Sequence, residues 1–285
     1  MIELPEINCR EIAQSIKDRV KNEIAELGVN LALAVVVVGN DPASEIYVRN
    51  KEKVCEYVGI KSVVVRLPET TQQEELEFVV KNLNSNSMFT GIMIQLPLPK
   101  HLNPTPVIEC IDYFKDVDGL TLYNQGLLAA GRLEACLVPC TPKGVLTMID
   151  SIGYELEGKH VAIFGRSELF GKPMLRLCLN RNATVSMCHS RSTGHDRRAL
   201  LQLCDVVIVA VGKPNEISLN PYYITDLLID VGINRTEDGI VGDVDKSSLP
   251  NKTLYTPVPG GVGLLTTATL AENTLQAYKL QKELF

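Results

Sequence analysis

The feature that most constrains the fold of this chain is the alternation of short apolar runs with longer segments of helical period. The run 31–38 is apolar throughout and rich in β-branched residues, which suits a strand covered on both faces of a parallel sheet. Further strands are expected at 62–67 and 91–96, and helices at 10–27, at about 44–58 and at 72–84. Ser44 is expected to cap the second helix and Gly59 to end it. This order predicts an α/β layer fold.

A second series of strands and helices follows a turn-rich middle between Pro97 and Pro142. Strands are expected at 161–164, 184–188, 205–211 and 227–232, and helices at 172–181, 196–203 and about 269–283. We therefore predict two α/β domains with the active-site cleft between them. The N-terminal catalytic domain spans 1–138 and is completed by the C-terminal helix 267–285, while a Rossmann-like parallel-sheet domain spans 139–266.

Charge and composition narrow the range of partners. The net charge is -6 and no basic stripe is present, so we expect no nucleic-acid partner. The most apolar run, 31–38, is much shorter than the about 20 residues that span a bilayer, and the N-terminus does not resemble a secretory signal. We therefore expect a cytoplasmic protein without membrane contact. The eight cysteines are scattered through apolar stretches, which predicts reduced core thiols and no metal site.

A glycine-containing turn, Gly165-Arg166-Ser167, directly follows the strand 161–164 and leads into a helix near Gly171. Such a turn offers free backbone N–H groups and a helix N-terminus to a pyrophosphate. The sequence departs from G-x-G-x-x-G because Ser167 holds the second glycine position and the last glycine arrives one residue late. A tight turn without a ligand therefore stays an alternative.

The end of the next strand indicates which dinucleotide binds. NAD-selective folds place an acid there, whereas this chain has Ser190 and Arg191. A hydroxyl and a guanidinium suit a 2′-phosphate, and Arg166 in the turn supplies a second cation. We therefore predict NADP as the cofactor, with a solvated loop cation as the alternative for Arg191.

Candidate catalytic groups lie in the first half of the chain. Tyr47 and Lys51 are four residues apart on a predicted helix and so project from one face. An exposed lysine beside a half-buried tyrosine, without a catalytic role, is an alternative explanation of this pattern. Short-chain dehydrogenases share the spacing, but their glycine turn precedes the Tyr/Lys pair, whereas here it follows the pair, so that class of enzyme is excluded. Gln95 is the single amide at the C-terminal end of a buried strand, where α/β sheets place ligand groups. Asp118 lies in a turn with Asp116, which is itself open to a purely structural role.

Six segments follow one another along the chain. They are Tyr47 to Lys51, Gly91 to Pro99, Lys115 to Gly119, Pro139 to Pro142, Gly165 to Pro173 and Thr256 to Gly263. In order and spacing they resemble the methylenetetrahydrofolate dehydrogenase/cyclohydrolase family over essentially the whole chain. The resemblance implies an enzyme of one-carbon metabolism that oxidises 5,10-methylenetetrahydrofolate with NADP and hydrolyses the methenyl product to 10-formyltetrahydrofolate. An enzyme with one of the two activities, or a non-catalytic NADP- or folate-binding regulator, remains an alternative.

The resemblance also implies roles for individual residues. Lys51 is the catalytic lysine, Tyr47 orients the folate, Gln95 hydrogen-bonds the lysine, and Asp118 holds the pterin. A partly desolvated lysine has a lowered pKa, which suits proton transfer near neutrality. The implied folate contacts also include Leu96, Pro97, Pro257, Gly260 and Gly261. The implied cofactor contacts are Thr141, Gly165, Arg166, Ser167, Ser190, Arg191, Ile233 and Thr266. Related enzymes pair through the Rossmann-like half, so a homodimer is expected.

Three positions depart from the family pattern. Leu264-Leu265 stands where the glycine-rich loop usually continues with Pro-Met, and Leu120-Thr121 stands where an aromatic residue and a His or Ser are common. Glu168 lies near the expected pyrophosphate, where its charge opposes binding unless the side chain faces solvent. All four candidate catalytic residues match the family.

Overall fold

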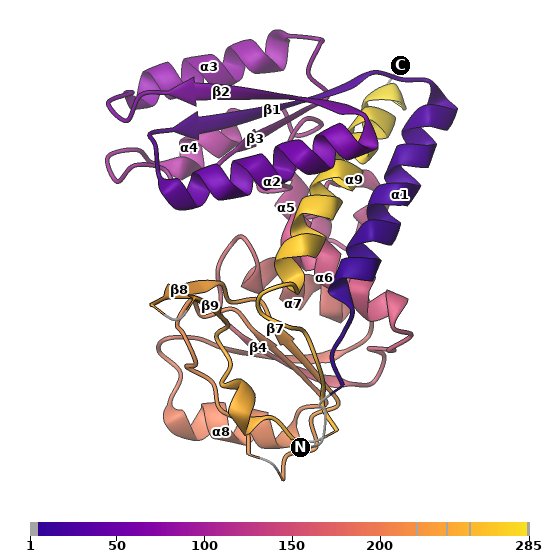
Figure 1. Cartoon of the computed structure of the whole chain (residues 1–285), viewed down its shortest axis with the longest axis vertical. Coiled ribbons are helices and arrows are strands. Elements are labelled where there is room, and N and C mark those ends of the chain that lie inside the picture. Colours follow the sequence, from indigo (N-terminus) through magenta and orange to yellow (C-terminus); the bar gives the residue numbers. More distant parts are fainter. Residues whose placement is uncertain (1–4, 221, 238, 251, 284–285) are drawn as a thin grey trace. The chain divides into compact units, whose positions relative to one another are not determined.

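The computed structural model describes residues 5–220, 222–237, 239–250 and 252–283, and it divides into two compact units (Figure 1). We call Gln14–Cys140 together with the residues from Thr267 onward the lysine unit, because it contains Lys51. The remainder, which is Thr141–Thr266 together with the residues up to Ala13, is the glycine-turn unit.

The N-terminal segment differs from the expected domain limits. The prediction placed all of 1–138 in one domain, whereas the described residues up to Ala13 group with the glycine-turn unit. The reason is a pair of backbone hydrogen bonds: Ile7 N donates to Tyr255 O at 2.9 Å, and Tyr255 N donates to Pro5 O at 3.1 Å. These bonds join the N-terminal segment to a strand of that unit.

The lysine unit contains a parallel sheet with β1 (Leu31–Val38) between β2 (Ile60–Leu67) and β3 (Gly91–Ile94). Every residue of β1 is buried, as its unbroken apolar run predicted. Helices α2 (Pro42–Val58) and α3 (Gln73–Ser85) connect these strands, and Figure 1 shows the three strands side by side. The alternation predicted from the sequence is confirmed.

The start of α2 differs from the prediction. Ser44 is not the cap: the helix begins at Pro42, and the side chain of Asp41 accepts from Ser44 N at 2.8 Å. Proline suits the first helical position because it has no N–H to leave unpaired there. The helix ends at Gly59, whose φ of 87° is left-handed, as expected.

Short helices occupy much of the region that was expected to be turns. They are α4 (Pro104–Glu109), α5 (Leu122–Ala129), the 3₁₀ helix η1 (Leu133–Ala135) and α6 (Cys140–Ser151). Prolines at the start of α4 read as turn residues in the sequence, although the first turn of a helix tolerates them. The last helix, α9 (Val262–Lys282), also begins earlier than predicted.

The glycine-turn unit contains a five-stranded parallel sheet in the order β10-β7-β6-β4-β5. The strands are β4 (His160–Phe164), β5 (Thr184–Cys188), β6 (Val206–Val209), β7 (Leu227–Asp230) and β10 (Leu254–Tyr255). Phe164 pairs with both Cys188 and Val209, and Val209 pairs with Asp230. The turns that follow β4 to β7 therefore emerge at one edge of the sheet, where such folds bind ligands. The predicted Rossmann-like sheet is confirmed.

The remaining elements complete the units. They are α1 (Cys9–Leu27), α7 (Gly171–Asn180), α8 (Gly194–Leu203), the antiparallel pair β8 (Asn234–Thr236) and β9 (Gly239–Val241), and the 3₁₀ helix η2 (Lys246–Ser248). The β8–β9 pair was not predicted because strands of three residues are too short to show a period. As expected, the eight cysteines are thiols, and all but Cys110 are buried. Among the described helices, none has the length and apolar character needed to cross a membrane.

Candidate active site

The amine of Lys51 and the amide of Gln95 form a direct pair in the lysine unit. Lys51 Nζ donates to Gln95 Oε1 at 2.8 Å, joining the middle of α2 to the residue that follows β3. Gln95 N donates to Val36 O at 2.8 Å, and Gln95 Nε2 donates to Leu96 O at 2.7 Å. The first bond fixes the main chain of Gln95 and the second fixes its side-chain NH₂ group, so that the amide oxygen faces the lysine. Leu96 and Pro97 follow directly, joined by a cis peptide bond.

Burial sets the charge state of this lysine. Lys51 is half-buried, and desolvation lowers the pKa of its amine, while the negative charge of Asp118 opposes that change. The direction agrees with the sequence-based expectation. An amine with a lowered pKa is neutral at a lower pH than a free lysine and can accept a proton there. Tyr47 lies one turn earlier on the same helix and is also half-buried.

The carboxylates of Asp116 and Asp118 lie in one turn but differ in burial and in the groups they contact. Asp116 is buried, and its Oδ2 accepts from Thr121 N at 2.8 Å and from Asn124 Nδ2 at 2.9 Å. Burial raises the pKa of Asp116, so this carboxyl has a structural role. Asp118 is half-buried and acts on Lys51 through its charge. Gly119 has a φ of 65°, and an added Cβ would lie 2.3 Å from a main-chain oxygen, so the turn requires glycine here.

Asn273 supports this turn and was missed by the sequence analysis. It lies fully buried on α9, and its Nδ2 donates to Val117 O and Val138 O, both at 2.8 Å. Cys140 Sγ also contacts Val117 O at 3.3 Å. The sequence did contain a signal for this residue, because Asn273 falls on the apolar face of the predicted helix. A buried amide there needs hydrogen-bond partners from other segments.

In the glycine-turn unit, the turn after β4 excludes any larger residue at two positions. An added Cβ would lie 2.2 Å from Ala210 O at Gly165, and 2.2 Å from Gly165 O at Gly171. Ser167 Oγ accepts from Phe170 N at 3.2 Å and from Gly171 N at 3.5 Å. The hydroxyl therefore stabilises the turn at the position where the usual motif has its second glycine.

The three residues predicted to bind the phosphate groups of the cofactor follow strands of the sheet at its carboxyl edge. Arg166 follows β4, while Ser190 and Arg191 follow the neighbouring strand β5, and all three are exposed. Glu168 is also exposed, at 72% of its side chain, and it forms an ion pair with Lys172. The charge of Glu168 therefore faces solvent and is partly neutralised by Lys172. It does not oppose the binding of a pyrophosphate in the way that the sequence suggested.

Two of the predicted cofactor residues are in direct contact. Thr266 Oγ1 donates to Thr141 Oγ1 at 3.0 Å, which joins the start of α9 to the start of α6. Ile233 follows β7 at the same sheet edge as the glycine turn, and 43% of its side chain is exposed. These three residues thus lie in one unit with the turn after β4.

The glycine-rich loop before α9 is a tight turn. Gly260 has a φ of 98°, and an added Cβ at Gly261 would lie 2.1 Å from Pro257 O. Leu264, which stands where the family usually has proline, uses its N–H to bind Gly261 O at 3.0 Å. Leu265 is fully buried. The departure at these leucines is accommodated by the first turn of the helix.

Comparison with known proteins identifies the family. The model described as the tetrahydrofolate dehydrogenase/cyclohydrolase catalytic domain matches residues 7–118, and that described as the NAD(P)-binding domain of the same family matches residues 139–282. The chain belongs to this family. It is 44% identical over 287 residues to the bifunctional protein FolD of Nitrosopumilus maritimus, covering 98% of each chain.

Solved structures of the tetrahydrofolate dehydrogenase/cyclohydrolase family have the same fold. The bifunctional enzyme FolD from Campylobacter jejuni superposes with a TM-score of 0.91 at 39% identity, covering 98% of this chain and 100% of that one. FolD from Trypanosoma brucei, complexed with NADP cofactor and an inhibitor, gives a TM-score of 0.92 at 32% identity, covering 99% of each. The family, the fold class and the enzyme class predicted from the six segments are confirmed, and the glycine turn lies in an NAD(P)-binding domain.

Proposed function

We propose that this chain oxidises 5,10-methylenetetrahydrofolate to the methenyl form with NADP, and then hydrolyses the methenyl form to 10-formyltetrahydrofolate. The observation that carries the proposal is the pair of Lys51 and Gln95, in which a half-buried amine of lowered pKa is held by an oriented amide. The second reaction needs a group of this kind, because water must lose a proton as it adds to the methenyl carbon.

The hydrolysis follows from the neutral form of Lys51. The amine accepts a proton from the attacking water while the oxygen bonds to the methenyl carbon. The hydroxyl group on that carbon then loses its remaining proton and becomes the formyl C=O, the bond from the carbon to N5 breaks, and N5 takes up one of the two protons, which leaves the formyl group on N10. One proton is released to solvent overall. Gln95 Oε1 accepts one lysine N–H and so positions the nitrogen for this transfer.

The oxidation depends on alignment rather than on proton transfer. NADP, when bound, accepts a hydride with its two electrons from the methylene carbon. The turn after β4 fits such a group because it has no room for side chains at Gly165 and Gly171. In the proposal Gly165, Arg166 and Ser167 hold the pyrophosphate, and Thr141, Ile233 and Thr266 complete the cofactor site.

Selection of NADP over NAD is proposed from the residues after β5. No acid follows this strand directly; Ser190 and Arg191 are exposed there, beside the turn that carries Arg166. A hydroxyl and two guanidinium groups favour the 2′-phosphate of NADP over the bare ribose of NAD.

The folate is proposed to bind through the lysine unit and the glycine-rich loop. Asp118 is proposed to hold the pterin and Tyr47 to orient the ring system. The remaining proposed contacts are Leu96, Pro97, Pro257, Gly260 and Gly261. The active-site cleft, the homodimer and the cytoplasmic location stay predictions.

The deciding experiment supplies the purified chain with methylenetetrahydrofolate and either NADP or NAD, and follows the methenyl and formyl products by absorbance. We expect NADPH to form, and methenyl hydrolysis to exceed the rate seen without protein. Absence of NADPH formation would favour a non-catalytic binding protein. If the methenyl product formed but was hydrolysed only at the rate seen without protein, the chain would have the dehydrogenase activity and lack the cyclohydrolase activity.

A further inference from the structure

Two buried aspartates lie behind the carboxyl edge of the sheet, and the proposed reactions use neither of them. Asp230 ends β7 and is 5% exposed, and Asp243, which follows β9, is fully buried. Asp243 N donates to Asp230 Oδ1 at 3.0 Å. An added Cβ at Gly242 would lie 1.9 Å from Asp230 Oδ2, and one at Gly232 would lie 2.2 Å from the Asp243 carboxyl. The two carboxylates therefore belong to one closely packed arrangement that requires glycine on both sides.

Asp243 holds the loop that follows β6. Its Oδ2 accepts from Val211 N at 2.6 Å and from Gly212 N at 2.8 Å. Its Oδ1 accepts from Lys213 N at 3.0 Å and from Asn234 Nδ2 at 2.8 Å. Successive main-chain N–H groups of this kind form a concave site for an anion, and here a carboxylate of the chain itself occupies it. The loop is thereby fixed in one conformation.

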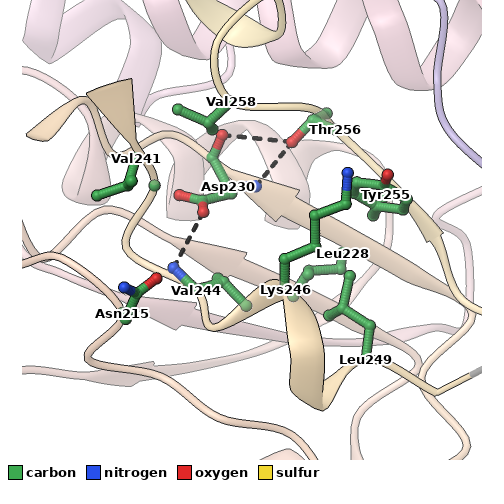
Figure 2. Close-up of a pocket in the computed structure, with 11 residues that line it drawn as sticks. Asn215, Leu228, Asp230, Val241, Val244, Lys246, Leu249, Tyr255, Thr256 and Val258 are labelled. Atoms are coloured by element: carbon green, nitrogen blue, oxygen red, sulfur yellow. Dashed lines mark hydrogen bonds between the residues drawn. The ribbon is translucent and has the colours of Figure 1, made fainter. Parts of the chain in front are cut away.

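Asp230 holds the segment that follows its own strand. Its Oδ1 accepts from Gly232 N at 2.9 Å, and its Oδ2 accepts from Val244 N at 3.0 Å. Figure 2 shows the bond to Val244 together with the bond from Asp230 N to Thr256 Oγ1, at the wall of a pocket of about 180 Å³. The carboxylate thus connects β7 to the segments on either side of it.

Ile233 lies between the two anchored positions. Gly232, on one side, is bound to Asp230, and Asn234, on the other, is bound to Asp243. We propose that Asp230 and Asp243 are positioning residues for the cofactor, which fix the loops 211–213 and 232–234 in the shape that binds NADP. The inference rests on the proposed function, because it takes Ile233 and this sheet edge as part of the NADP site.

The substitution Asp243→Asn tests this role with little change of volume. It removes the negative charge and turns an NH₂ group toward main-chain N–H donors, which cannot bond to it. Loss of one charge-assisted hydrogen bond corresponds to roughly tenfold to a hundredfold in an equilibrium constant. We expect the dissociation constant and the KM for NADP to rise by about tenfold or more, while the KM for methylenetetrahydrofolate stays near the wild-type value. A general loss of structure would raise both.

The matched control is Asp245→Asn. Asp245 also accepts a main-chain N–H, from Ser247 at 3.0 Å, but it caps η2, and its side chain otherwise accepts from the hydroxyl groups of Ser218 and Ser247. Asn234→Ala provides a milder second variant, because it removes the 2.8 Å bond to Asp243 and leaves both carboxylates in place. It should raise the KM for NADP a few-fold, and the control should leave it unchanged.

The measurements are NADP titration of the full chain by calorimetry, steady-state kinetics with each substrate varied, and hydrogen exchange of the cofactor-free protein. The amides of Val211, Gly212 and Lys213 should exchange faster in Asp243→Asn than in wild type or the control. Wild-type exchange at these amides, or an unchanged KM for NADP in both test variants, would overturn the positioning role alone. Failure of the wild-type chain to bind NADP would overturn the proposed function itself.

Discussion

The side chain of Lys51 combines a half-buried position with an amine that exchanges protons in the proposed hydrolysis. Burial lowers the pKa of this amine, and Asp118 favours the charged form. Gln95 Oε1 accepts one of the N–H bonds in either protonation state. The residue is thus stable in place whether it carries its proton or not, which a general acid–base group requires.

Lys51→Met should separate the two activities. It keeps most of the length of the side chain and removes the amine, so methenyl hydrolysis should fall by about 10²-fold or more. NADPH formation should survive in part because hydride transfer needs alignment only. Gln95→Ala should shift hydrolysis in the same direction, and Lys53→Met, an exposed lysine on the same helix, should change neither rate. Hydrolysis at the wild-type rate in Lys51→Met would show that the amine is a bystander.

The same substitution should raise stability in a pH-dependent way. Because the pKa of Lys51 is lower in the folded state than the ordinary value of 10.5, the unfolded chain binds more protons between these two values. Stability therefore rises with pH through that window, and the cost of burying the charge is fully present below it. Lys51→Met should be more stable than wild type by about 1 kcal/mol at pH 7, measured by urea unfolding. The difference should shrink as the pH approaches 10, and a constant difference would contradict the assigned cause.

Arg191 should decide between the two dinucleotides. Removing its guanidinium by Arg191→Ala should weaken NADP binding by roughly tenfold to a hundredfold and change NAD binding little. The control is Arg198→Ala, which removes an exposed arginine from α8. Titration of both cofactors into each variant provides the measurement. Equal losses for NADP and NAD would contradict the assignment of Arg191 to the 2′-phosphate, and no loss for either cofactor would make Arg191 a solvated loop cation.

At the scale of elements, α9 supports the turn that carries Asp118. Asn273 binds two main-chain oxygens that belong to different segments, Val117 O and Val138 O. The helix thus acts on the site through one amide, while its apolar residues fill the core. Sequence periodicity indicated the helix but not this amide, because partners distant in the chain leave no local pattern.

Asn273→Ala should therefore destabilise the protein strongly. It removes the amide donor from two buried carbonyl oxygens, of which Val117 O keeps only the weaker thiol donor of Cys140, and this should cost about 2–4 kcal/mol in the free energy of unfolding. Gln276→Ala, a half-buried amide on the same helix, should cost less than about 1 kcal/mol. Denaturant unfolding of both variants checks this. A loss at Asn273 no larger than that at Gln276 would contradict the supporting role.

At the scale of the whole molecule, the two units divide the chemistry. The lysine unit carries the groups proposed for proton transfer, and the glycine-turn unit carries the NAD(P)-binding fold. Each unit has its own parallel sheet and its own buried core. In the proposed function the two reactions take place one after the other at the same carbon of the folate, which first loses a hydride and then gains the oxygen of water.

Assembly is a prediction at this scale. The resemblance to related enzymes predicts that the glycine-turn unit pairs with a second copy of itself. Light scattering at micromolar concentration should give twice the mass of one chain, independent of NADP. The mass of a single chain at that concentration would show that this protein departs from its relatives.

The sequence alone determined the parts of this protein that depend on neighbouring residues. The apolar run 31–38 specified a buried parallel strand, and the turn at Gly165 specified a tight connection from a strand to a helix. Six ordered segments were enough to indicate the family. These signals are local, because period, turn chemistry and motif spacing are properties of consecutive residues.

Only the tertiary structure decided how similar side chains divide their roles. It buried Asp116 among hydrogen-bond donors and left Asp118 to act on Lys51 through its charge, although only Val117 separates the two in the sequence. It also joined Asp230 to Asp243, two acids that lie 13 residues apart in the sequence without a motif to connect them. The physical reason is that burial and hydrogen-bond partners are set by segments that meet only after packing, so the environment of a carboxylate is not encoded next to it in the chain.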